Sequence, residues 1–331
     1  MPVASAATAA LAARLAGRPG LVLERAAPLA RLTTLRVGGP AELLAEARTE
    51  ADLVFLLRTT HELAAPWFLL GWGSNVLIPD EGIPGVVVRL GEGFRRAAIR
   101  GTRVAAGAAL ALPKLALRTA AADLMGLEAL AGIPSSVGGA VAMNAGCYGT
   151  EMKDSLVSVR LVEHDGTRRR LPYAALAPGY RRTNLRERRA IVTRAHFELT
   201  PAPPGAARAR IEELRQRRRG ALPTGHPNAG SVFKNPPGDY AGRLIEAAGL
   251  KGKRVGAAEI SARHANVIVN LGGATATDVF ALMLAAHHAV RDRFGISLDP
   301  EWVLAGHLAA RWREATGDEA SASSLSFPIP V

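Results

Sequence analysis

Residues 132–149 read GIPSSVGGAVAMNAGCYG, a run that is apolar and yet holds almost no large side chain before its end. Such a run leaves the backbone bare, and this constrains the fold more than any other part of the sequence. It fits a tight turn in the core, where glycine permits positive φ or close packing. It also fits a backbone cradle whose N–H groups approach an anionic ligand. The run alone does not decide between these two interpretations.

The chain is long enough for a sizeable core: it has 331 residues, of which 48% are hydrophobic, and this length predicts two domains or more. No apolar run approaches the ~20 residues of a membrane-spanning helix. The alanine-rich N-terminus lacks a basic region and contains Arg14, so we expect a helix or loose extension there and no signal peptide. The single cysteine, Cys147, rules out an internal disulfide, suits a reducing cytoplasm and leaves no cluster for a structural metal site.

The net charge of +12 makes nucleic-acid binding the first alternative to weigh. Arginines crowd into residues 168–170, 186–189 and 215–219, but only 5% of residues are aromatic and few lie among these arginines. A base-stacking surface is therefore poorly supported, and a solvated arginine-rich surface is favoured. A cleft that attracts small polyanions, such as dinucleotides or sugar nucleotides, is a third possibility. Charge alone does not choose among them.

Short strand-like and helical segments alternate along the chain, which is typical of a mixed α+β fold. We expect strands at residues 41–47, 67–70, 86–90, 156–163, 167–171, 191–199 and 264–270. We expect helices at residues 49–62, 110–122, 206–219, 240–248 and 275–293. The proline-rich residues 201–205 predict a linker, and hence a domain boundary near residue 203. Residues 321–331 are small, polar and proline-containing, so we expect a loose tail.

Four further motifs carry groups that could bind or react. Residues 71–78 (GWGSNVLI) follow a strand but lack the third glycine of a Rossmann fingerprint, so a phosphate-binding turn and a structural turn are about equally supported. Residues 228–236 (NAGSVFKNP) place a hydroxyl, an ammonium and an amide close together. The other two motifs are residues 180–183 (YRRT) and 299–301 (DPE). Taken singly, each of the last three motifs is better explained by a turn serine, a surface arginine or an exposed acid.

Taken together, these motifs resemble the flavin-dependent UDP-N-acetylenolpyruvoylglucosamine reductases (UDP-N-acetylmuramate dehydrogenases) of bacterial cell-wall synthesis. Residues 34–39 (TLRVGG), 127–149 and 241–246 (AGRLIE) add to the series, which runs in the family's order from about residue 32 to residue 306. The short chain between Arg181 and Ser231 resembles the family variant without the extra substrate-capping loop. The alternatives are another FAD-dependent oxidase with the same cofactor fold and a basic nucleic-acid-binding protein.

The resemblance implies an α+β protein with an FAD-binding domain of the vanillyl-alcohol-oxidase (PCMH) type in two lobes, at residues 31–203. A helical extension at residues 1–30 would precede it, and a separate α+β substrate-binding domain would follow at residues 204–298. A strand at residues 299–307 would carry Glu301, and residues 308–331 would form a flexible tail.

The family pattern also implies the cofactor contacts. Relatives that attach the flavin covalently often carry a histidine where Asn75 stands, so the FAD of this chain is expected to be non-covalent. Backbone N–H groups of the two glycine-rich segments would surround its pyrophosphate. The expected cofactor-binding residues are Gly71, Trp72, Gly73, Ser74, Asn75, Val76, Leu77, Gly132, Ile133, Pro134, Gly138, Gly139 and Ala140. Trp72 departs from the family, which has a glycine at that position.

The implied reaction is NADPH-dependent reduction of UDP-N-acetylenolpyruvoylglucosamine to UDP-N-acetylmuramate. Hydride from flavin N5 adds to the enolpyruvyl carbon, and negative charge builds toward the carboxylate. By resemblance, Ser231 donates the proton, while Arg181 and Glu301 stabilise the enolate-like state. An ionised Glu301 would repel that charge, so it must be protonated or act through Arg181. Lys234 and Asn235 would contact the substrate. We expect a cytoplasmic monomer that binds no nucleic acid and no metal and does not insert into membranes.

Overall fold

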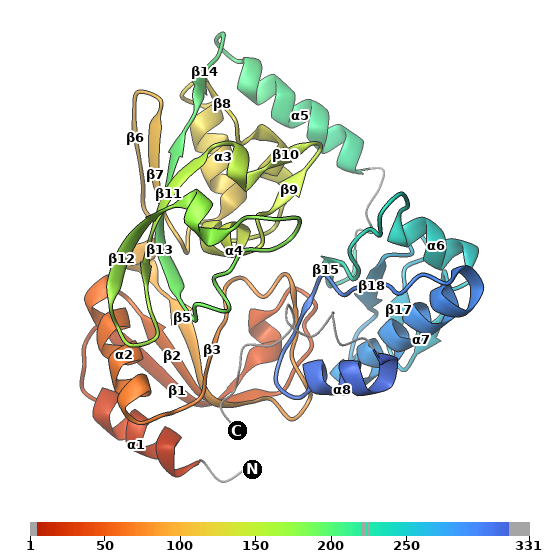
Figure 1. The fold of residues 1–331 in the computed structure, drawn as a ribbon, viewed down its shortest axis with the longest axis horizontal. Helices are drawn as coiled ribbons and strands as arrows, with labels where there is room; N and C mark the ends of the chain where they lie inside the picture. The colour runs from red at the N-terminus through yellow and green to blue at the C-terminus, as the bar shows by residue number, and fades with distance from the viewer. Residues whose placement is uncertain (1–4, 220–222, 224, 318–331) are drawn as a thin grey trace. The chain divides into compact units, whose positions relative to one another are not determined.

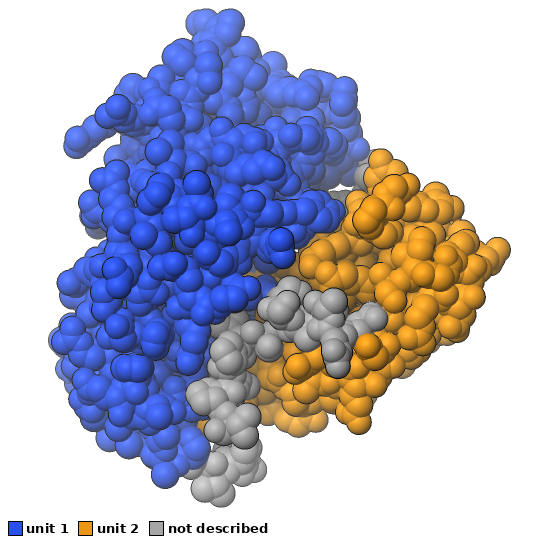
Figure 2. Space-filling view, in the orientation of Figure 1, with its two compact units in different colours: residues 1–24, 43–72, 85–220 blue, residues 25–42, 73–84, 221–331 orange. Residues whose placement is uncertain are grey.

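The computed structural model describes residues 5–219, 223 and 225–317, and the chain divides into two compact units (Figure 2). Unit 1 comprises residues 1–24, 43–72 and 85–220, and unit 2 comprises residues 25–42, 73–84 and 221–331. The chain therefore passes from one unit to the other several times. This interleaving was not foreseen in the sequence, where each domain was expected to be one continuous segment.

A four-stranded sheet has the order β1 (Leu21–Pro28), β2 (Pro40–Ala47), β5 (Ile83–Leu90) and β3 (Trp67–Leu69). Helix α2 (Glu50–Glu62) begins where predicted, because the Thr49 hydroxyl accepts a hydrogen bond from the N–H of Asp52 at 3.2 Å. Helix α1 (Ala6–Leu15) packs against α2 and buries Leu11 and Leu15. Within the described part of the expected helical extension at residues 1–30, only Ala6–Leu15 form an α-helix, and strand β1 at Leu21–Pro28 was not predicted.

The second sheet of unit 1 is antiparallel and has the order β12-β11-β13-β7-β6 (Figure 1). Its strands are β6 (Ala97–Arg100), β7 (Arg103–Gly107), β11 (Leu156–Val162), β12 (Arg168–Pro172) and β13 (Ile191–Glu198). Alternation along β13 turns Ala195 and Phe197 into the core of unit 1, on the face where α4 (Val137–Ala142) contacts β13 and β7. The predicted β11–β12 hairpin is confirmed, with Gly166 at φ +85° in its turn.

The predicted domain boundary near residue 203 is wrong. Helix α5 (Ala206–Arg219), which follows the proline-rich segment, belongs to unit 1. Its apolar side chains Ala207 and Ile211 are buried in the core of that unit, near α3 (Leu112–Ala120) and the 3-10 helix η3 (Glu128–Gly132). Proline and glycine marked a turn before a helix that then packs back on the same core, so the first residue of unit 2 in this region is residue 221.

Unit 2 has an antiparallel sheet in the order β15-β18-β17-β16. Its strands are β15 (Asn228–Ser231), β16 (Arg254–Val255), β17 (Ala258–Ile260) and β18 (Val267–Asn270). Helices α6 (Ala241–Ala247) and α7 (Ala276–Phe294) supply much of the core. Two-residue strands β4 (Val76–Leu77) and β19 (Val303–Leu304) pair in parallel, which brings residues 303–304 beside an early segment of the chain. Only these two residues of the expected strand at residues 299–307 are paired in this way.

The expectation of a flexible tail from residue 308 is wrong for its first part. Residues 308–316 form helix α8 (Leu308–Thr316), and Trp312 on this helix is fully buried. Its ring meets the rings of Phe280 and His287 edge to face at 6.1 and 5.2 Å between centroids. Buried aromatic area therefore orders this helix. The expected loose residues 321–331 lie outside the described residues.

Short elements complete the fold. The remaining strands are β8 (Leu124–Met125), β9 (Gly146–Cys147), β10 (Thr150–Glu151) and β14 (Thr200–Pro201). The remaining 3-10 helices are η1 (Leu29–Leu32), η2 (Glu92–Phe94), η4 (Met152–Asp154) and η5 (Tyr173–Leu176). Across the described ranges, every helix is too short or too polar to cross a bilayer. Strands and helices are mixed in both units, so the α+β class is confirmed.

Candidate active site

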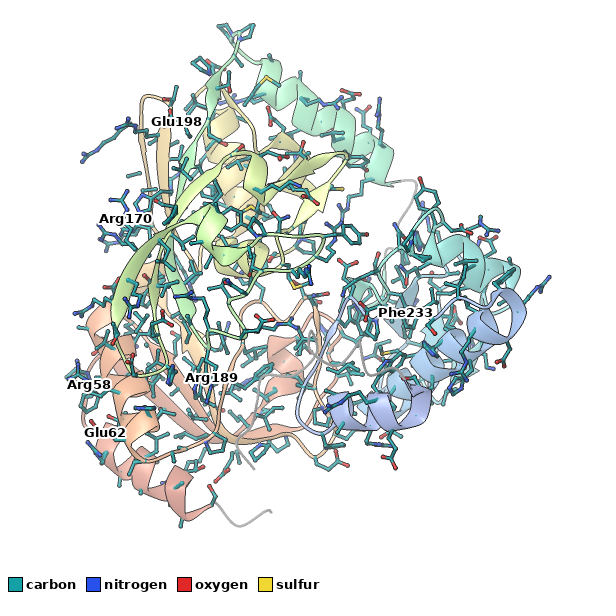
Figure 3. All side chains as sticks on the ribbon, viewed as in Figure 1. Arg58, Glu62, Arg170, Arg189, Glu198 and Phe233 are labelled. Carbon is teal, nitrogen blue, oxygen red and sulfur yellow. The ribbon has the colours of Figure 1, made fainter. Side chains whose placement is uncertain are left out.

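In unit 2 the structure brings Ser231 and Glu301 onto adjoining segments. Ser231 ends strand β15 opposite Val267, and the next residue, Val232, accepts a hydrogen bond from the N–H of Glu301 at 2.8 Å. Phe233, labelled in Figure 3, bridges to Pro300 and is buried in the core. Two predicted catalytic residues are therefore held by one short backbone ladder. The hydroxyl of Ser231 is half-buried and makes no hydrogen bond to any atom in residues 5–219, 223 or 225–317.

Buried side chains fix the strand that carries Ser231. Asn266 accepts a hydrogen bond from the N–H of Phe233 at 2.9 Å and donates one to the carbonyl of Phe233 at 2.8 Å. Trp302 is fully buried, and its Nε1–H donates to the carbonyl of Ala229 at 3.0 Å. Because both side chains satisfy main-chain groups on either side of Ser231, the position of its hydroxyl is set by the core of unit 2.

The side chain of Asn75 is hydrogen-bonded to the segment that carries Glu301. Its Nδ2 donates to the main-chain carbonyl of Glu301 at 3.0 Å, beside the parallel pair β4–β19. Gly73, two residues earlier, has φ +64°, and a Cβ there would lie 2.3 Å from the carbonyl oxygen of Leu32. Only glycine fits such an approach. The N–H of Thr34 donates to the carbonyl of Gly73 at 3.0 Å, so residues 32–34 are fastened to the same loop.

Lys234 and Asn235 already have structural partners. The ammonium of Lys234 forms an ion pair with Asp299, and its N–H donates to the carbonyl of Asp299 at 2.9 Å. The Oδ1 of Asn235 accepts a hydrogen bond from the N–H of Ala241 at the start of α6, at 3.1 Å. The side chains expected to contact substrate thus also fasten this loop to the rest of unit 2, and the Asn235 amide nitrogen has no hydrogen-bond partner within residues 5–219, 223 and 225–317.

The two glycine-rich segments differ in what their N–H groups do. In the first, the main-chain N–H groups of residues 71–75 donate to no acceptor in the described part of the chain. Gly73 is buried even so, whereas Trp72 is 40% exposed. Consecutive amides without protein acceptors are what an anion needs. This loop fits the phosphates of a dinucleotide.

In the second segment most N–H groups are already satisfied. Those of Ile133, Gly138 and Ala140 donate to the carbonyls of Leu130, Ala108 and Ser136 at 2.8–3.0 Å. The N–H of Gly139 donates to the Ser136 hydroxyl at 3.1 Å. The expectation that this segment offers its amides to a pyrophosphate is therefore not supported at these four residues. Close packing explains Gly138 instead, because a Cβ there would lie 2.9 Å from that of Ala108.

Arg181 lies in unit 1, so the structure does not define its position relative to Ser231 and Glu301 in unit 2. Its backbone is left-handed, with φ +55°, and its Nη2 donates to the carbonyl of Gly146 at 2.9 Å. The guanidinium lies 4.9 Å from the centroid of the Tyr180 ring. Thr183 donates to the carbonyl of Ala142 at 2.8 Å and so fastens this loop to the end of α4.

Two ionisable groups near the loop that carries Arg181, those of Glu151 and Arg186, have shifted pKa values. Burial raises the pKa of Glu151, but hydrogen bonds from Lys153 and Asn144 and the charge of Arg181 outweigh it, so the pKa of this carboxyl lies below its usual value. Burial lowers the pKa of Arg186 to about 10, and its Nη2 lies 3.7 Å from the sulfur of Met143. Glu151 therefore remains a stable anion close to Arg181.

Basic helix α5 pairs several of its arginines internally. Arg210 and Arg217 both form ion pairs with Glu213, which supports a solvated face. Arg218 is an exception: its Nη1 lies 3.7 Å from the sulfur of Cys147, and the side chain would meet a Cβ placed on Gly132. Cys147, on strand β9, thus lies beside the guanidinium of Arg218. The side chain of Arg219 lies outside the described residues.

Two contributions escaped the sequence reasoning. Asn75 is one of the expected cofactor-binding residues, but its hydrogen bond to the carbonyl of Glu301 was not predicted. Asn144, inside the second glycine-rich segment, is fully buried and hydrogen-bonded to four groups around the Arg181 loop. A buried amide within a run of small apolar residues was the available signal for the second, since such a group needs partners.

Two family models match the chain. Residues 41–172 match the FAD binding domain family, and residues 222–305 match the C-terminal domain of UDP-N-acetylenolpyruvoylglucosamine reductase. UDP-N-acetylenolpyruvoylglucosamine reductase 2 of Symbiobacterium thermophilum is 45% identical over 289 residues, which cover 87% of this chain and 94% of that protein. The reductase of Anaeromyxobacter sp. (strain Fw109-5) is 47% identical over 286 residues, covering 86% and 89%.

A solved structure agrees. The crystal structure of UDP-N-acetylenolpyruvylglucosamine reductase from Thermus caldophilus has a TM-score of 0.74 and 41% sequence identity, and the match covers 86% of this chain and 98% of that one. The predicted FAD-binding α+β fold and the predicted oxidoreductase class are thereby confirmed. The chain belongs to the UDP-N-acetylenolpyruvoylglucosamine reductase family of FAD-containing oxidoreductases.

Proposed function

We propose that this protein reduces UDP-N-acetylenolpyruvoylglucosamine to UDP-N-acetylmuramate with NADPH, in peptidoglycan precursor synthesis. One observation carries the proposal. Ser231 presents a hydroxyl that has no hydrogen-bond partner among the residues that the structure describes, on a segment hydrogen-bonded to the one that bears Glu301. A hydroxyl that closes a turn or caps a helix would have a main-chain partner. The names of the relatives supply the substrate.

The residues of the first glycine-rich segment suit a non-covalently bound FAD. The N–H groups of residues 71–75 would receive its phosphates, and Asn75 offers no side chain that a flavin could alkylate. When bound, FAD supplies the hydride-transfer chemistry between NADPH and the enolpyruvyl group. Close packing around Gly138 gives the second segment a shaping role, since its amides are engaged.

The chain's own residues handle the charge and the proton. Arg181 would bind the substrate carboxylate and stabilise the negative charge that builds there during reduction. Ser231 would give its proton to the α-carbon, a centre basic enough to deprotonate an alcohol. Glu301 would act as a neutral acid or through Arg181, because a second anion would oppose the reaction. Lys234 and Asn235 would orient the sugar nucleotide.

We also propose a cytoplasmic monomer. All residues assigned to the chemistry belong to one chain, so the mechanism asks for no residue from a second copy. The single cysteine suits a reducing compartment. Sedimentation of the purified protein at several concentrations tests the monomer directly, because a dimer would double the observed mass.

An absorption spectrum tests the central proposal. The purified protein should be yellow, and acid precipitation should release FAD into the supernatant. NADPH should bleach the flavin, and UDP-N-acetylenolpyruvoylglucosamine should restore its colour. Flavin that precipitates with the chain would contradict the non-covalent assignment. Bleaching by NADPH without reoxidation by this substrate would instead show that the family's oxidoreductase chemistry serves another acceptor.

A further inference from the structure

Asn144 is the buried centre of a hydrogen-bond network in unit 1. Its Nδ2 donates to Glu151 Oε2 at 3.0 Å and to the carbonyl of Gly179 at 3.1 Å. Its Oδ1 accepts from the N–H of Lys153 at 3.0 Å and from the hydroxyl of Tyr173 at 3.3 Å. The side chain has no exposed surface, and it uses both of its donors and accepts two hydrogen bonds. Each partner comes from a different short segment.

This network ends at the segment that carries Arg181. Gly179 and Arg182 form an isolated antiparallel bridge, so the carbonyl held by Asn144 belongs to a tight turn with Arg181 inside it. Arg181 has φ +55°, a conformation that costs a non-glycine residue free energy unless its surroundings enforce it. The hydrogen bond from Asn144 to Gly179, with that from Thr183 to Ala142, supplies this enforcement at the two sides of the turn.

The same amide also sets the charge beside Arg181. Asn144 and Lys153 hold the carboxylate of Glu151, and that carboxylate interacts electrostatically with Arg181. A guanidinium with a fixed counter-charge on one side has fewer orientations available for a second anion. Asn144 thereby influences both the backbone and the charge environment of Arg181.

We propose that Asn144 is a positioning residue that orients the Arg181 guanidinium toward the substrate carboxylate. The proposal rests on the proposed function, since it takes Arg181 as the group that stabilises the enolate-like charge. Asparagine suits the position for two reasons. It tolerates the left-handed backbone observed at Asn144, with φ +39°, and its amide can donate to a carboxylate and to a carbonyl at the same time. Aspartate satisfies only the first requirement.

The test uses two variants of the FAD-loaded enzyme. Asn144→Asp keeps the shape and the backbone preference but turns an oxygen toward Glu151 and the Gly179 carbonyl. Asn144→Gly keeps the left-handed backbone and removes the amide. In stopped-flow experiments we expect flavin reduction by NADPH at the normal rate and reoxidation by substrate slowed by up to ~10²-fold, the scale of a small misplacement of a reacting group. Asn184→Gly is the control, because its amide donates only to Ala175 in the same loop.

A double-mutant cycle shows whether the effect passes through Arg181. In an Arg181→Ala background, removing Asn144 should slow reoxidation no further. If Arg181→Ala slows reoxidation and the Asn144 substitution multiplies that loss, the positioning role is wrong while the function stands. If Arg181→Ala alone has no effect, both the role of Arg181 and this inference are overturned.

An Asn144 variant that cannot bind FAD would give no information on flavin reoxidation. A milder substitution in the same hydrogen-bond network is therefore included. Tyr173→Phe removes only the hydroxyl that donates to Asn144 and to the Val141 carbonyl. We expect it to retain FAD and to slow reoxidation by a few-fold, again only when Arg181 is present. Equal slowing in the presence and absence of Arg181 would overturn the proposal.

Discussion

Asn75 and Glu301 are joined by a hydrogen bond of 3.0 Å from the Asn75 amide to the Glu301 carbonyl, across 226 positions of sequence. The contact fastens an early glycine-rich loop to the segment that carries a proposed catalytic acid. It lies next to the parallel pair β4–β19, so side-chain and main-chain hydrogen bonds act on the same junction. A residue first noticed because it cannot bond to flavin therefore has a positive role in holding Glu301.

Replacing Asn75 by alanine should weaken this junction. Loss of one hydrogen bond to a carbonyl typically costs about 1 kcal/mol of unfolding free energy. We expect a loss of that size in urea unfolding, together with slower flavin reoxidation by substrate, because Glu301 is no longer held. Flavin reduction by NADPH should change less. A variant that loses its FAD completely would show that Asn75 serves the cofactor more than Glu301.

The Ser231 hydroxyl offers the sharpest test of the chemistry. Ser231→Ala should keep its FAD and its reduction by NADPH, while turnover falls by ~10²-fold or more, the scale of lost general acid catalysis. Ser231→Cys keeps a proton donor and should recover part of the loss. Since the hydroxyl makes no hydrogen bond among the described residues, thermal stability should be nearly unchanged. Near-normal turnover by Ser231→Ala would assign the proton to water or to another side chain.

Truncation of Trp312 should show that α8 is part of the fold. This side chain is fully buried against Phe233, Phe280 and His287. Trp312→Ala should therefore lower the unfolding free energy by about 3–5 kcal/mol, the usual cost of removing a buried aromatic ring. Glu314→Ala, on the exposed side of the same helix, is the control. Equal, small effects of both substitutions in thermal unfolding would mean that α8 adds little to stability.

His196 should make stability depend on pH. Burial lowers its pKa, and the charges of Arg170, Arg160 and Arg194 lower it further; Arg160 lies opposite both other arginines across the strands. Figure 3 shows Arg170 on the outer side of the sheet. The folded state therefore favours neutral His196. Its contribution is complete above the unfolded pKa of 6.5 and is lost as the pH falls from there toward the lower folded pKa.

The check is urea unfolding at about pH 7.5 and about pH 5. Wild-type protein should lose more stability between these values than His196→Gln. Arg160→Gln should raise the pKa of His196, which a proton NMR titration would measure directly. An unchanged pKa in Arg160→Gln would mean that Arg160 does not contribute, and that burial and the other two arginines cause the shift.

Local signals in the sequence predicted much of the fold. Thr49 marked the start of α2, and Asp165–Gly166 marked the β11–β12 turn, because caps and turns depend on neighbouring residues only. Strand β1 and helix α8 were missed for the opposite reason. Leu21 and Trp312 are ordered by distant core residues, and a short window of sequence does not contain those partners.

The site was predictable as a set of residues but not as a geometry. Ser231, Arg181 and Glu301 came from resemblance to a family that the comparisons confirm, while their roles remain predictions. The sequence could not show that Gly138 serves close packing, since a glycine that donates to a ligand and one that donates to Ala108 look alike in sequence. Nor could it show the partners of Lys234 and Asn235, which depend on Asp299 and Ala241.

The interleaved units have a consequence for biosynthesis. Residues 25–42 and 73–84 leave the ribosome long before residues 221–331, with which they form unit 2. At ~5–20 residues per second, Leu35, Val37 and Leu77 wait on the order of ten seconds or more for the core that buries them. During this time unit 2 exists only as separated apolar fragments, while residues 85–220 of unit 1 are still being synthesised. The nascent chain is thus a natural client for chaperones that shield apolar segments, and unit 2 can form only after residues 221–331 have emerged.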